Sequence, residues 1–410
     1  MARNIIAALD VGTSTVQTVV VERQTEGGGL RILGMGVVPS SGIRRGAIVD
    51  LEEATHSIRK SVEEASRQAG VTIRSVWVAV NGSHISVSSS RGVVAISRAD
   101  GEISPEDVRR AIAAAETFIA KAANREILHM IPRDFRVDHE AGIKDPVGMH
   151  GVRLEVDTLI VECSAPMLKN ILKCIEGAGL KVEDYVFGPL AVAEAFLTKR
   201  QKELGVMLLD IGGGTASFVV FEEGAPLHAG VLSIGGNQIT NDVAIGFRTH
   251  VDVAERIKIT YGSCLPGDIG KKDAVKLADF VPGEVATFSR RELAEIVEAR
   301  LKDVFELLQK ELKKIDRKEL LPAGVVVVGG SALLPGILSL TRDEIGLPVG
   351  LGISSAFNEV DGETSLAFAS CLGTLQWAHM RLKAPRSLWE SKVSSFGQSK
   401  WIKWLKTLLP

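Results

Sequence analysis

Apolar and polar positions along this chain predict a mixed α/β protein. Two apolar runs each pass through a Gly/Thr/Ser-rich turn into a run of β-branched residues. They read IIAALDVGTSTVQTVVV (5–21) and VMLLDIGGGTASFVVF (206–221). Each run predicts a β-hairpin. A third segment, GVVVVGGSALLPGI (324–337), predicts a buried strand that ends in a glycine turn, followed by a helix start with Pro335.

Other patterns predict helices and an inserted unit. Apolar residues at a spacing of three to four predict helices over 51–69, 165–177 and 291–315. Between the first two lies a stretch, residues 84–162, that is rich in predicted strands and holds one further helix. Ser104 and Asp107 resemble a capping box for that helix. This stretch therefore predicts a small inserted domain.

Length, charge and cysteine content narrow the class of protein. A chain of 410 residues predicts two to four domains. The formal net charge of −2 argues against a general nucleic-acid binder, so no nucleic-acid partner is expected. Four cysteines without CxxC spacing predict core thiols of a reduced cytosolic protein. No signal peptide and no apolar run of about 20 residues is present, so any membrane contact is expected to be peripheral.

The two hairpin turns carry the candidate chemistry. Glycines let the backbone approach a ligand closely, and successive N–H groups in such a turn form an anion nest. The Asp that enters each turn suits a cation better than a phosphate. One such hairpin could be an ordinary turn, and the third segment could be an ordinary loop between strand and helix. Two matched hairpins that face each other would clamp the phosphates of a nucleotide and a Mg²⁺ ion.

The last twelve residues, SKWIKWLKTLLP, differ from everything before them. On a helix of 3.6 residues per turn, the apolar side chains fall on one arc and the polar ones on the other. A basic amphipathic helix with interfacial tryptophans is typical of a membrane-surface anchor, and a polar linker at 383–398 separates it from the body. A core helix is the alternative. The predicted membrane-binding residues are Lys400, Trp401, Ile402, Lys403, Trp404, Leu405, Leu408 and Leu409.

The three nucleotide elements, in this order and spacing, resemble the actin-like ATPase superfamily. The stretches 131–156, 233–262 and VVGGSALLPGI narrow the resemblance to the FtsA family of bacterial cell-division proteins. The resemblance implies an actin-like ATPase fold, with two ribonuclease-H-like halves and inserted subdomains around a nucleotide cleft. The implied division is subdomain IA (1–83 and 163–200), IC (84–162), IIA (201–235 and 320–382), IIB (236–319), a linker (383–398) and a membrane-targeting helix (399–410).

The same resemblance implies the cofactors ATP and Mg²⁺ and a set of site residues. Asp10 and Asp210 would hold Mg²⁺, through water, and Glu255 and Lys258 would face the ribose and base. A solvated ion pair is the alternative for the last two. The implied nucleotide-binding residues are Asp10, Gly12, Thr13, Ser14, Asp210, Gly212, Gly213, Gly214, Thr215, Glu255, Lys258, Gly329, Gly330 and Ser331.

Three positions depart from the family pattern. Thr15 stands where a Lys is usual after the first turn, and Ser331 replaces a glycine. Gly188 precedes Pro189, where MreB-like relatives have a Glu that orients the attacking water. Glu194 lies nearly two turns further along the same helix. The sequence therefore supports ATP binding more firmly than hydrolysis, and it names no general base.

The function implied by the resemblance is that of a polymerising protein. It would tether the ring of FtsZ to the cytoplasmic face of the inner membrane at the division septum, through the C-terminal helix. The expected partners are FtsZ, further copies of the chain, later cell-division proteins through residues 84–162, and an anionic membrane surface. The alternatives are a PilM-like assembly scaffold and a sugar-kinase-type enzyme on the same fold. The enzyme would need an acidic base, which the sequence does not reveal.

Overall fold

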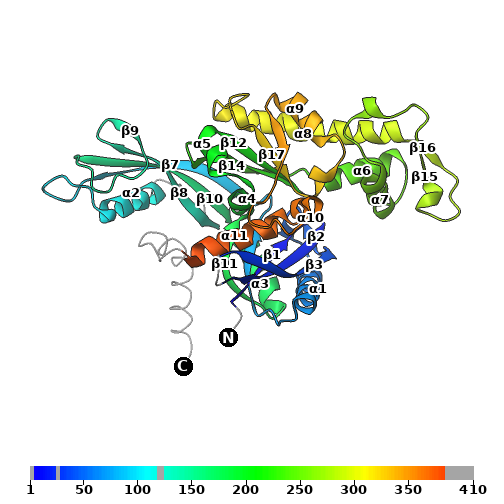
Figure 1. Cartoon of the computed structure of the whole chain (residues 1–410), viewed down its shortest axis with the longest axis horizontal. Helices are drawn as coiled ribbons and strands as arrows, with labels where there is room; N and C mark the ends of the chain where they lie inside the picture. The colour runs from blue at the N-terminus through cyan, green and yellow to red at the C-terminus, as the bar shows by residue number, and fades with distance from the viewer. Residues whose placement is uncertain (1–3, 25–27, 118–123, 384–410) are drawn as a thin grey trace.

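Two five-stranded sheets with the same strand arrangement form the body of the molecule (Figure 1). The computed structural model describes residues 4–24, 28–117 and 124–383. The first sheet has the order β3-β2-β1-β6-β11 and the second the order β14-β13-β12-β17-β18. In both, the first three strands are antiparallel and the last two continue in parallel. The strands are β1 (Ile5–Val11), β2 (Thr15–Arg23), β3 (Leu30–Pro39), β6 (Ser75–Val80), β11 (Lys181–Phe187), β12 (Val206–Ile211), β13 (Ala216–Glu222), β14 (Ala225–Leu232), β17 (Val325–Val328) and β18 (Val349–Leu351).

The repeated topology confirms the predicted fold class. Both predicted hairpins are present, as β1–β2 and β12–β13. Asp10 pairs with Gln17 in the first hairpin and Asp210 with Ser217 in the second. Each Asp is thus one residue from the end of its strand, so the two halves present equivalent carboxylates at equivalent turns.

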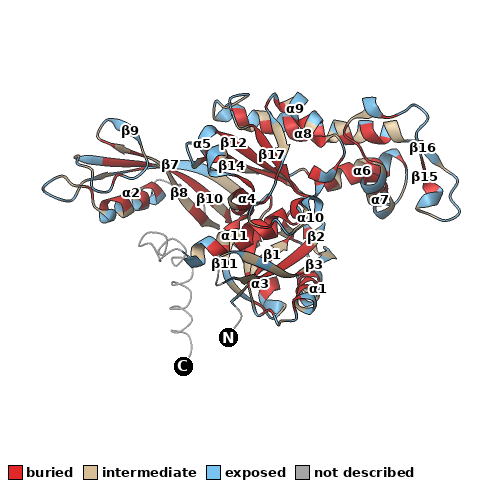
Figure 2. Ribbon diagram, viewed as in Figure 1, coloured by how far each residue is buried: buried red, intermediate tan, exposed pale blue. Residues whose placement is uncertain are grey.

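Helices α4 (Gly188–Phe196) and α11 (Ala369–Lys383) lie between the two sheets. They pack against each other, and α11 also contacts β1 and β6. Along α4 every residue except Glu194 is buried, and α11 is buried over most of its length (Figure 2). These two helices therefore join the halves into one core. The other helices of the two halves are α1 (Leu51–Ala69), α3 (Ala165–Gly177), α5 (Lys199–Leu204), α9 (Ile337–Ile345) and α10 (Gly362–Ala367).

Local signals in the sequence placed several helices correctly. The helices over 51–69 and 165–177 have the predicted bounds, and the long helix α8 (Arg290–Lys314) is shifted by one residue. Gly70 ends α1 in the left-handed conformation, as glycine favours. The prediction that a helix starts at Pro335 is wrong. A 3₁₀ turn (Gly330–Leu333) follows β17, and α9 begins only at Ile337, because Gly336 has φ +83° and interrupts the helical backbone.

An inserted sheet with its own core lies at one end of the molecule (Figure 1, left). Its strand order is β7-β10-β8-β9, and one helix packs on it. A separate apolar cluster that includes Ile103, Phe135 and Val156 fills the space between that helix and the sheet. The predicted capping box is present, since Ser104 and Asp107 each bond the other's backbone N–H. The elements are β7 (Ile85–Ala95), α2 (Pro105–Thr117), β8 (Arg125–Val137), β9 (Glu140–Ile143) and β10 (Arg153–Ser164).

A second peripheral unit lies at the opposite end (Figure 1, right). It contains α6 (Gly236–Gly246), α7 (Val251–Tyr261), β15 (Ala274–Lys276), β16 (Thr287–Ser289) and the first part of α8, with 3₁₀ turns at Pro266–Asp268 and Leu277–Asp279. A small hairpin, β4 (Ile43–Arg44) and β5 (Ala47–Ile48), precedes α1. All four cysteines are free and buried, as predicted. No helix within the described ranges is long and apolar enough to span a bilayer. The predicted linker from residue 384 onward and the amphipathic helix lie outside the described residues.

Candidate functional site

The two hairpin turns and the glycine turn after β17 surround a single cavity between the halves. Its volume is about 530 Å³. The structure places every one of the fourteen predicted nucleotide-binding residues in the cavity wall. Those residues come from four segments far apart in the sequence, 10–14, 210–215, 255–258 and 329–331, and the fold brings all four to one cavity.

Within each turn, one glycine amide closes the hairpin. The Gly12 N–H donates to the Thr15 carbonyl at 3.1 Å, and the Gly212 N–H donates to the Thr215 carbonyl at 3.0 Å. These two amides are therefore not available to a ligand. The remaining turn amides donate no hydrogen bond to any described residue; they belong to Thr13, Ser14, Gly213 and Gly214. Four N–H groups from the two sides of the cavity are thus left for an anion.

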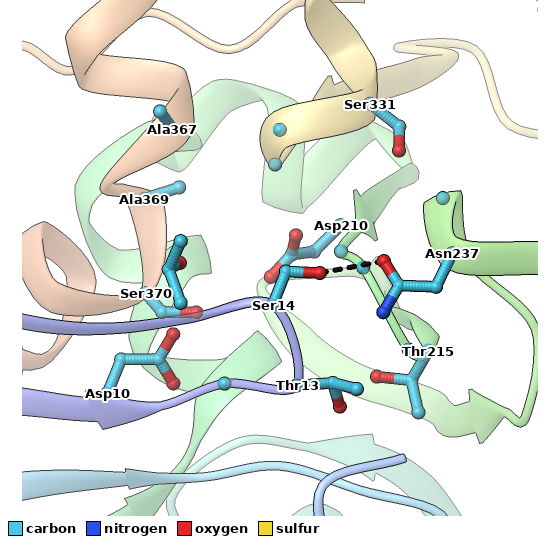
Figure 3. A pocket seen from close by; sticks show the side chains of 18 of the residues that line it. Asp10, Thr13, Ser14, Asp210, Thr215, Asn237, Ser331, Ala367, Ala369 and Ser370 are labelled. Atoms are coloured by element: carbon cyan, nitrogen blue, oxygen red, sulfur yellow. Dashed lines mark hydrogen bonds between the residues drawn. The ribbon is translucent and has the colours of Figure 1, made fainter. Parts of the chain in front are cut away.

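The hairpins approach each other so closely that glycine is required on one side. A Cβ atom at Gly213 would overlap the Ser14 side chain, and one at Gly214 would overlap Thr13. Ser14 Oγ donates a hydrogen bond of 2.7 Å across the cavity to Asn237 Oδ1, at the start of α6 (Figure 3). The Asn237 N–H in turn donates to the Gly213 carbonyl at 2.7 Å. Asn237 therefore links both hairpins, and the sequence patterns did not reveal it.

Asp10 and Asp210 form an acidic pair at the cavity. Burial and the nearby charge of Asp210 raise the pKa of Asp10 to about 7, although a hydrogen bond from Asn81 opposes the shift. Burial raises the pKa of Asp210 to about 6, against a hydrogen bond from Ser370. Two neighbouring carboxylates in a low-dielectric site resist simultaneous ionisation unless a cation neutralises them.

The chemistry of this pair fits Mg²⁺, which prefers carboxylate oxygens and keeps several water ligands. Among the residues that the structure describes, no group of three or more His, Cys, Asp or Glu side chains could hold a metal ion. Asp10 and Asp210 would hold the ion together with phosphate oxygens and water.

Glu255 and Lys258, on α7, also line the cavity. Lys258 is buried, and its Nζ lies 2.6 Å from Glu255 Oε2, 2.9 Å from Thr240 Oγ1 and 3.2 Å from the Gly236 carbonyl. The i,i+3 ion pair of the alternative is therefore present, with Lys258 buried and the Glu255 side chain 37% exposed. The pair is a fixed part of the wall, and Lys258 ties α7 to α6.

The glycine turn after β17 contributes bare backbone to the cavity. Gly329 has φ +90°, and a Cβ there would overlap the Asp210 carboxylate. Gly330 has open space where a Cβ would stand. Leu334 and Pro335 continue this side of the wall with apolar surface. A flat apolar group such as a purine base can lie on this side, while the polar turns lie on the other.

Sequence reasoning missed several wall residues. Asn81 directly follows β6, so the rule that ligands bind beyond the carboxyl ends of parallel strands could have found it. Ser370 is the second residue of α11, and the sequence carries no local signal that places it at this site. Glu194 does not line the cavity, and it pairs with Lys202 at 2.8 Å. It is therefore no candidate for a base in this site.

Two family profiles match the sequence of this chain. The profile described as "Cell division protein FtsA" matches residues 207–373, and "SHS2 domain inserted in FTSA" matches residues 82–162. Curated relatives with the name "Cell division protein FtsA" are similar over most of the chain. The relative from Pseudomonas aeruginosa is 39% identical, over 85% of this chain and 82% of its own. The relative from Escherichia coli is 34% identical, over 85% of both chains.

Solved structures with the same fold are more distant in sequence. A chain of the PilM-PilN type IV pilus biogenesis complex has a TM-score of 0.66 at 18% identity, and the match covers 93% of this chain and 99% of that one. MreB5 of Spiroplasma citri bound to ADP has a TM-score of 0.53 at 15% identity, with coverage of 93% and 99%. At these identities the likeness establishes the actin-like fold and nothing about partners.

Proposed function

The chain belongs to the FtsA family of cell-division proteins, and on that premise we propose that it is an ATP-binding, actin-like protein that polymerises and tethers the FtsZ ring to the inner membrane. The observation that supports ATP binding is the cavity between two matched hairpins, which offers four free turn amides and a pair of carboxylates. The phosphates would accept from the turn amides, and Mg²⁺ would bind between Asp10 and Asp210 through water.

The rest of the nucleotide would extend along the opposite wall of the cavity. The ribose would lie near Glu255 and Lys258, and the adenine on the bare backbone of Gly330 beside Leu334. The structural neighbour MreB5, with 15% identity, is described as bound to ADP. That neighbour supports a nucleotide in this kind of cleft, and the residues named here give the proposal its specific form for this chain.

Hydrolysis is proposed to be slow. The carboxylates in the described cavity wall are Asp10, Asp210 and Glu255. The first two face the proposed cation, and the third is paired with Lys258. None of them is placed as a general base for an attacking water, so ATP would persist in the bound state.

The remaining parts of the function rest on the family and the sequence. We propose that the chain is divided into subdomains IA, IC, IIA and IIB, and that IC binds later cell-division proteins. We propose in the same way that its partners are FtsZ and further copies of the chain. We also propose that it acts at the septum, on the cytoplasmic face of the inner membrane.

Electron microscopy on lipid monolayers with ATP tests self-association and should show filaments. Isolated particles at every concentration would contradict self-association.

The two alternative functions lack a specific observation in their favour. The PilM likeness, at 18% identity, is one of fold, whereas relatives at 34–39% identity over most of the chain are cell-division proteins. A sugar-kinase-type enzyme would need an acidic base next to a substrate pocket. No carboxylate in the described cavity wall is free for that role.

Nucleotide binding is tested by filling the cavity without disturbing the fold. Gly330→Val places a side chain into open space that the adenosine would occupy. Titration with fluorescent ATP should show an affinity loss of at least about tenfold, equivalent to about 1.4 kcal/mol.

Slow hydrolysis is tested by measuring phosphate release from the wild-type protein. The rate should stay below about 1 s⁻¹, a low rate for an enzyme.

Gly350→Val is the matched control. Gly350 lies in β18, away from the cavity, and also has open space at its Cβ position. This variant should bind ATP like the wild type. Wild-type affinity in Gly330→Val, with an unchanged melting temperature, would refute the site. Gly213→Val is a less selective test, because its Cβ would also overlap Ser14.

A further inference from the structure

Asn237, the second residue of α6, is fixed to both hairpin turns. Its backbone N–H donates to the Gly213 carbonyl at 2.7 Å, and the preceding Gly236 N–H donates to the Gly212 carbonyl at 2.9 Å. From the other side of the cavity, Ser14 Oγ donates to Asn237 Oδ1 at 2.7 Å. The backbone and the side-chain oxygen of this residue are therefore both held, which sets the direction of its side-chain amide.

The nitrogen of that amide is open to the cavity. Asn237 lies in the cavity wall, and its Nδ2 donates no hydrogen bond to any residue that the structure describes. Nδ2 is also not among the buried polar atoms that lack a partner, so it keeps accessible surface. In Figure 3 this nitrogen points toward the side chains of Thr13 and Thr215, one from each hairpin. Two N–H bonds of one side chain are thus available to a ligand.

The polar groups nearby favour a ligand with several acceptor oxygens. The free backbone N–H groups of the two turns are all donors; they belong to Thr13, Ser14, Gly213 and Gly214. The Thr13 hydroxyl accepts from the Gly46 N–H at 3.0 Å, which leaves its own proton for an acceptor. The Asn237 amide adds two further donors to this set. A phosphate group can satisfy such a set, because all its oxygens accept.

The charges in the wall make neutral donors important for phosphate binding. Among the described residues of the wall, Lys258 is the only cation. Its Nζ already contacts Glu255 Oε2, Thr240 Oγ1 and the Gly236 carbonyl. Phosphate oxygens that do not bind the proposed Mg²⁺ would therefore need uncharged N–H and O–H groups. A side-chain amide meets this need, whereas a carboxylate in the same place would repel the phosphate.

We propose that Asn237 is a phosphate-binding residue, whose Nδ2 donates to a phosphate oxygen of the bound nucleotide while Ser14 holds its Oδ1. This inference rests on the proposed binding of ATP, and it adds a side chain of α6 to the backbone amides of the two turns. Because α6 belongs to the second peripheral unit, the phosphates would contact that unit directly as well as both halves of the body.

Substitution by Ala and by Asp tests the donor role of the amide. Asn237→Asp keeps an acceptor for Ser14 but replaces the two N–H bonds with a negative charge. In a titration with fluorescent ATP and excess Mg²⁺, the affinity of Asn237→Ala should fall by about tenfold, as expected for a lost hydrogen bond to a charged group. The affinity of Asn237→Asp should fall further, because its carboxylate repels the phosphate.

Asn241→Asp is the matched control. Asn241 lies one turn further along α6, is exposed and does not line the cavity, so the same substitution there should leave ATP binding like that of the wild type. Adenosine provides a second control, since it carries no phosphate. Its dissociation constant, measured by competition with fluorescent ATP, should be the same in the wild type and in both Asn237 variants.

Two results would overturn the inference. One is an affinity for ATP in Asn237→Asp that equals or exceeds that of Asn237→Ala. The other is a loss of adenosine affinity as large as the loss of ATP affinity, which would mean that Asn237 only maintains the shape of the cavity. Failure of the wild type to bind ATP would instead refute the proposed nucleotide site itself, so the two failures are distinguishable.

Discussion

Asp10 shows how a single side chain reports on the state of the cavity. Its pKa lies at about 7 in the folded protein, because of burial and the charge of Asp210, against an ordinary value of 3.8. The folded state therefore retains a proton that the unfolded state releases at lower pH. The stability contributed by this proton is fully present below pH 3.8 and is lost as pH rises through about 7.

Asp10→Asn should remove this pH dependence. Relative to the wild type, its free energy of unfolding should increase from about pH 5 to about pH 8, because the neutral amide avoids both the burial of a charge and its repulsion by Asp210. Urea denaturation in EDTA, without nucleotide, measures the difference. A constant difference across this range would contradict a raised pKa of Asp10. Added Mg²⁺ and ATP should diminish the pH dependence in the wild type, since the cation neutralises the pair.

The start of α2 shows how one helix terminus organises the inserted sheet. Asp107 accepts hydrogen bonds from the Ser97 N–H at 3.1 Å, and from the N–H and Oγ of Ser104 at 3.0 and 2.6 Å. Arg110 pairs with the same carboxylate at 3.0 Å. Burial raises the pKa of Asp107, but the hydrogen bonds from Ser104 and Ser97 outweigh it and lower the pKa to about 2. This carboxylate therefore joins the loop after β7 to α2.

Asp107→Ala should destabilise the inserted sheet by about 3 kcal/mol, since it removes several hydrogen bonds to a buried charge. Hydrogen exchange of the amides in residues 85–164 measures the loss locally. Glu106→Ala is the control on the same turn. Its side chain is 62% exposed and paired with Arg109, so its loss should cost less than about 1 kcal/mol. Equal effects of the two substitutions would contradict the role assigned to Asp107.

We propose that the protein combines an actin-like body with the membrane anchor predicted from the sequence. The anchor, residues 399–410, lies outside the described residues, so its role rests on the sequence alone. Three lysines near an anionic leaflet contribute on the order of 3 kcal/mol, and ordering the tail opposes binding. One tail would thus bind reversibly, and a filament would gain avidity by repeating it.

Trp401→Glu or Trp404→Glu should abolish flotation with liposomes that contain anionic lipid, because either change places a charge on the apolar arc. ATP binding and thermal stability should remain close to the wild type. Lys403→Ala should act more weakly, by about 1 kcal/mol, and less at high salt. Had the helix packed on the body as core, the Trp→Glu variants would melt at lower temperature. A destabilised variant that still floats with liposomes would refute the anchor.

The sequence by itself determined the features that depend on neighbouring residues. The β-hairpins around Asp10 and Asp210 and the bounds of α1 and α3 follow from local periodicity, glycine turns and caps. The fourteen site residues followed from two similar motifs and a family resemblance, and all of them line one cavity. Whether they bind ATP remains a prediction.

Only the tertiary structure decided which groups meet across long sequence distances. The Ser14–Asn237 hydrogen bond spans 223 residues. The close approach of Gly188 to Asn81 depends on how α4 packs beside β6. The burial of Lys258 likewise depends on its contacts with α6. No local pattern encodes such contacts, because they arise when separately formed elements pack together, and the chemistry of the cavity depends on that packing.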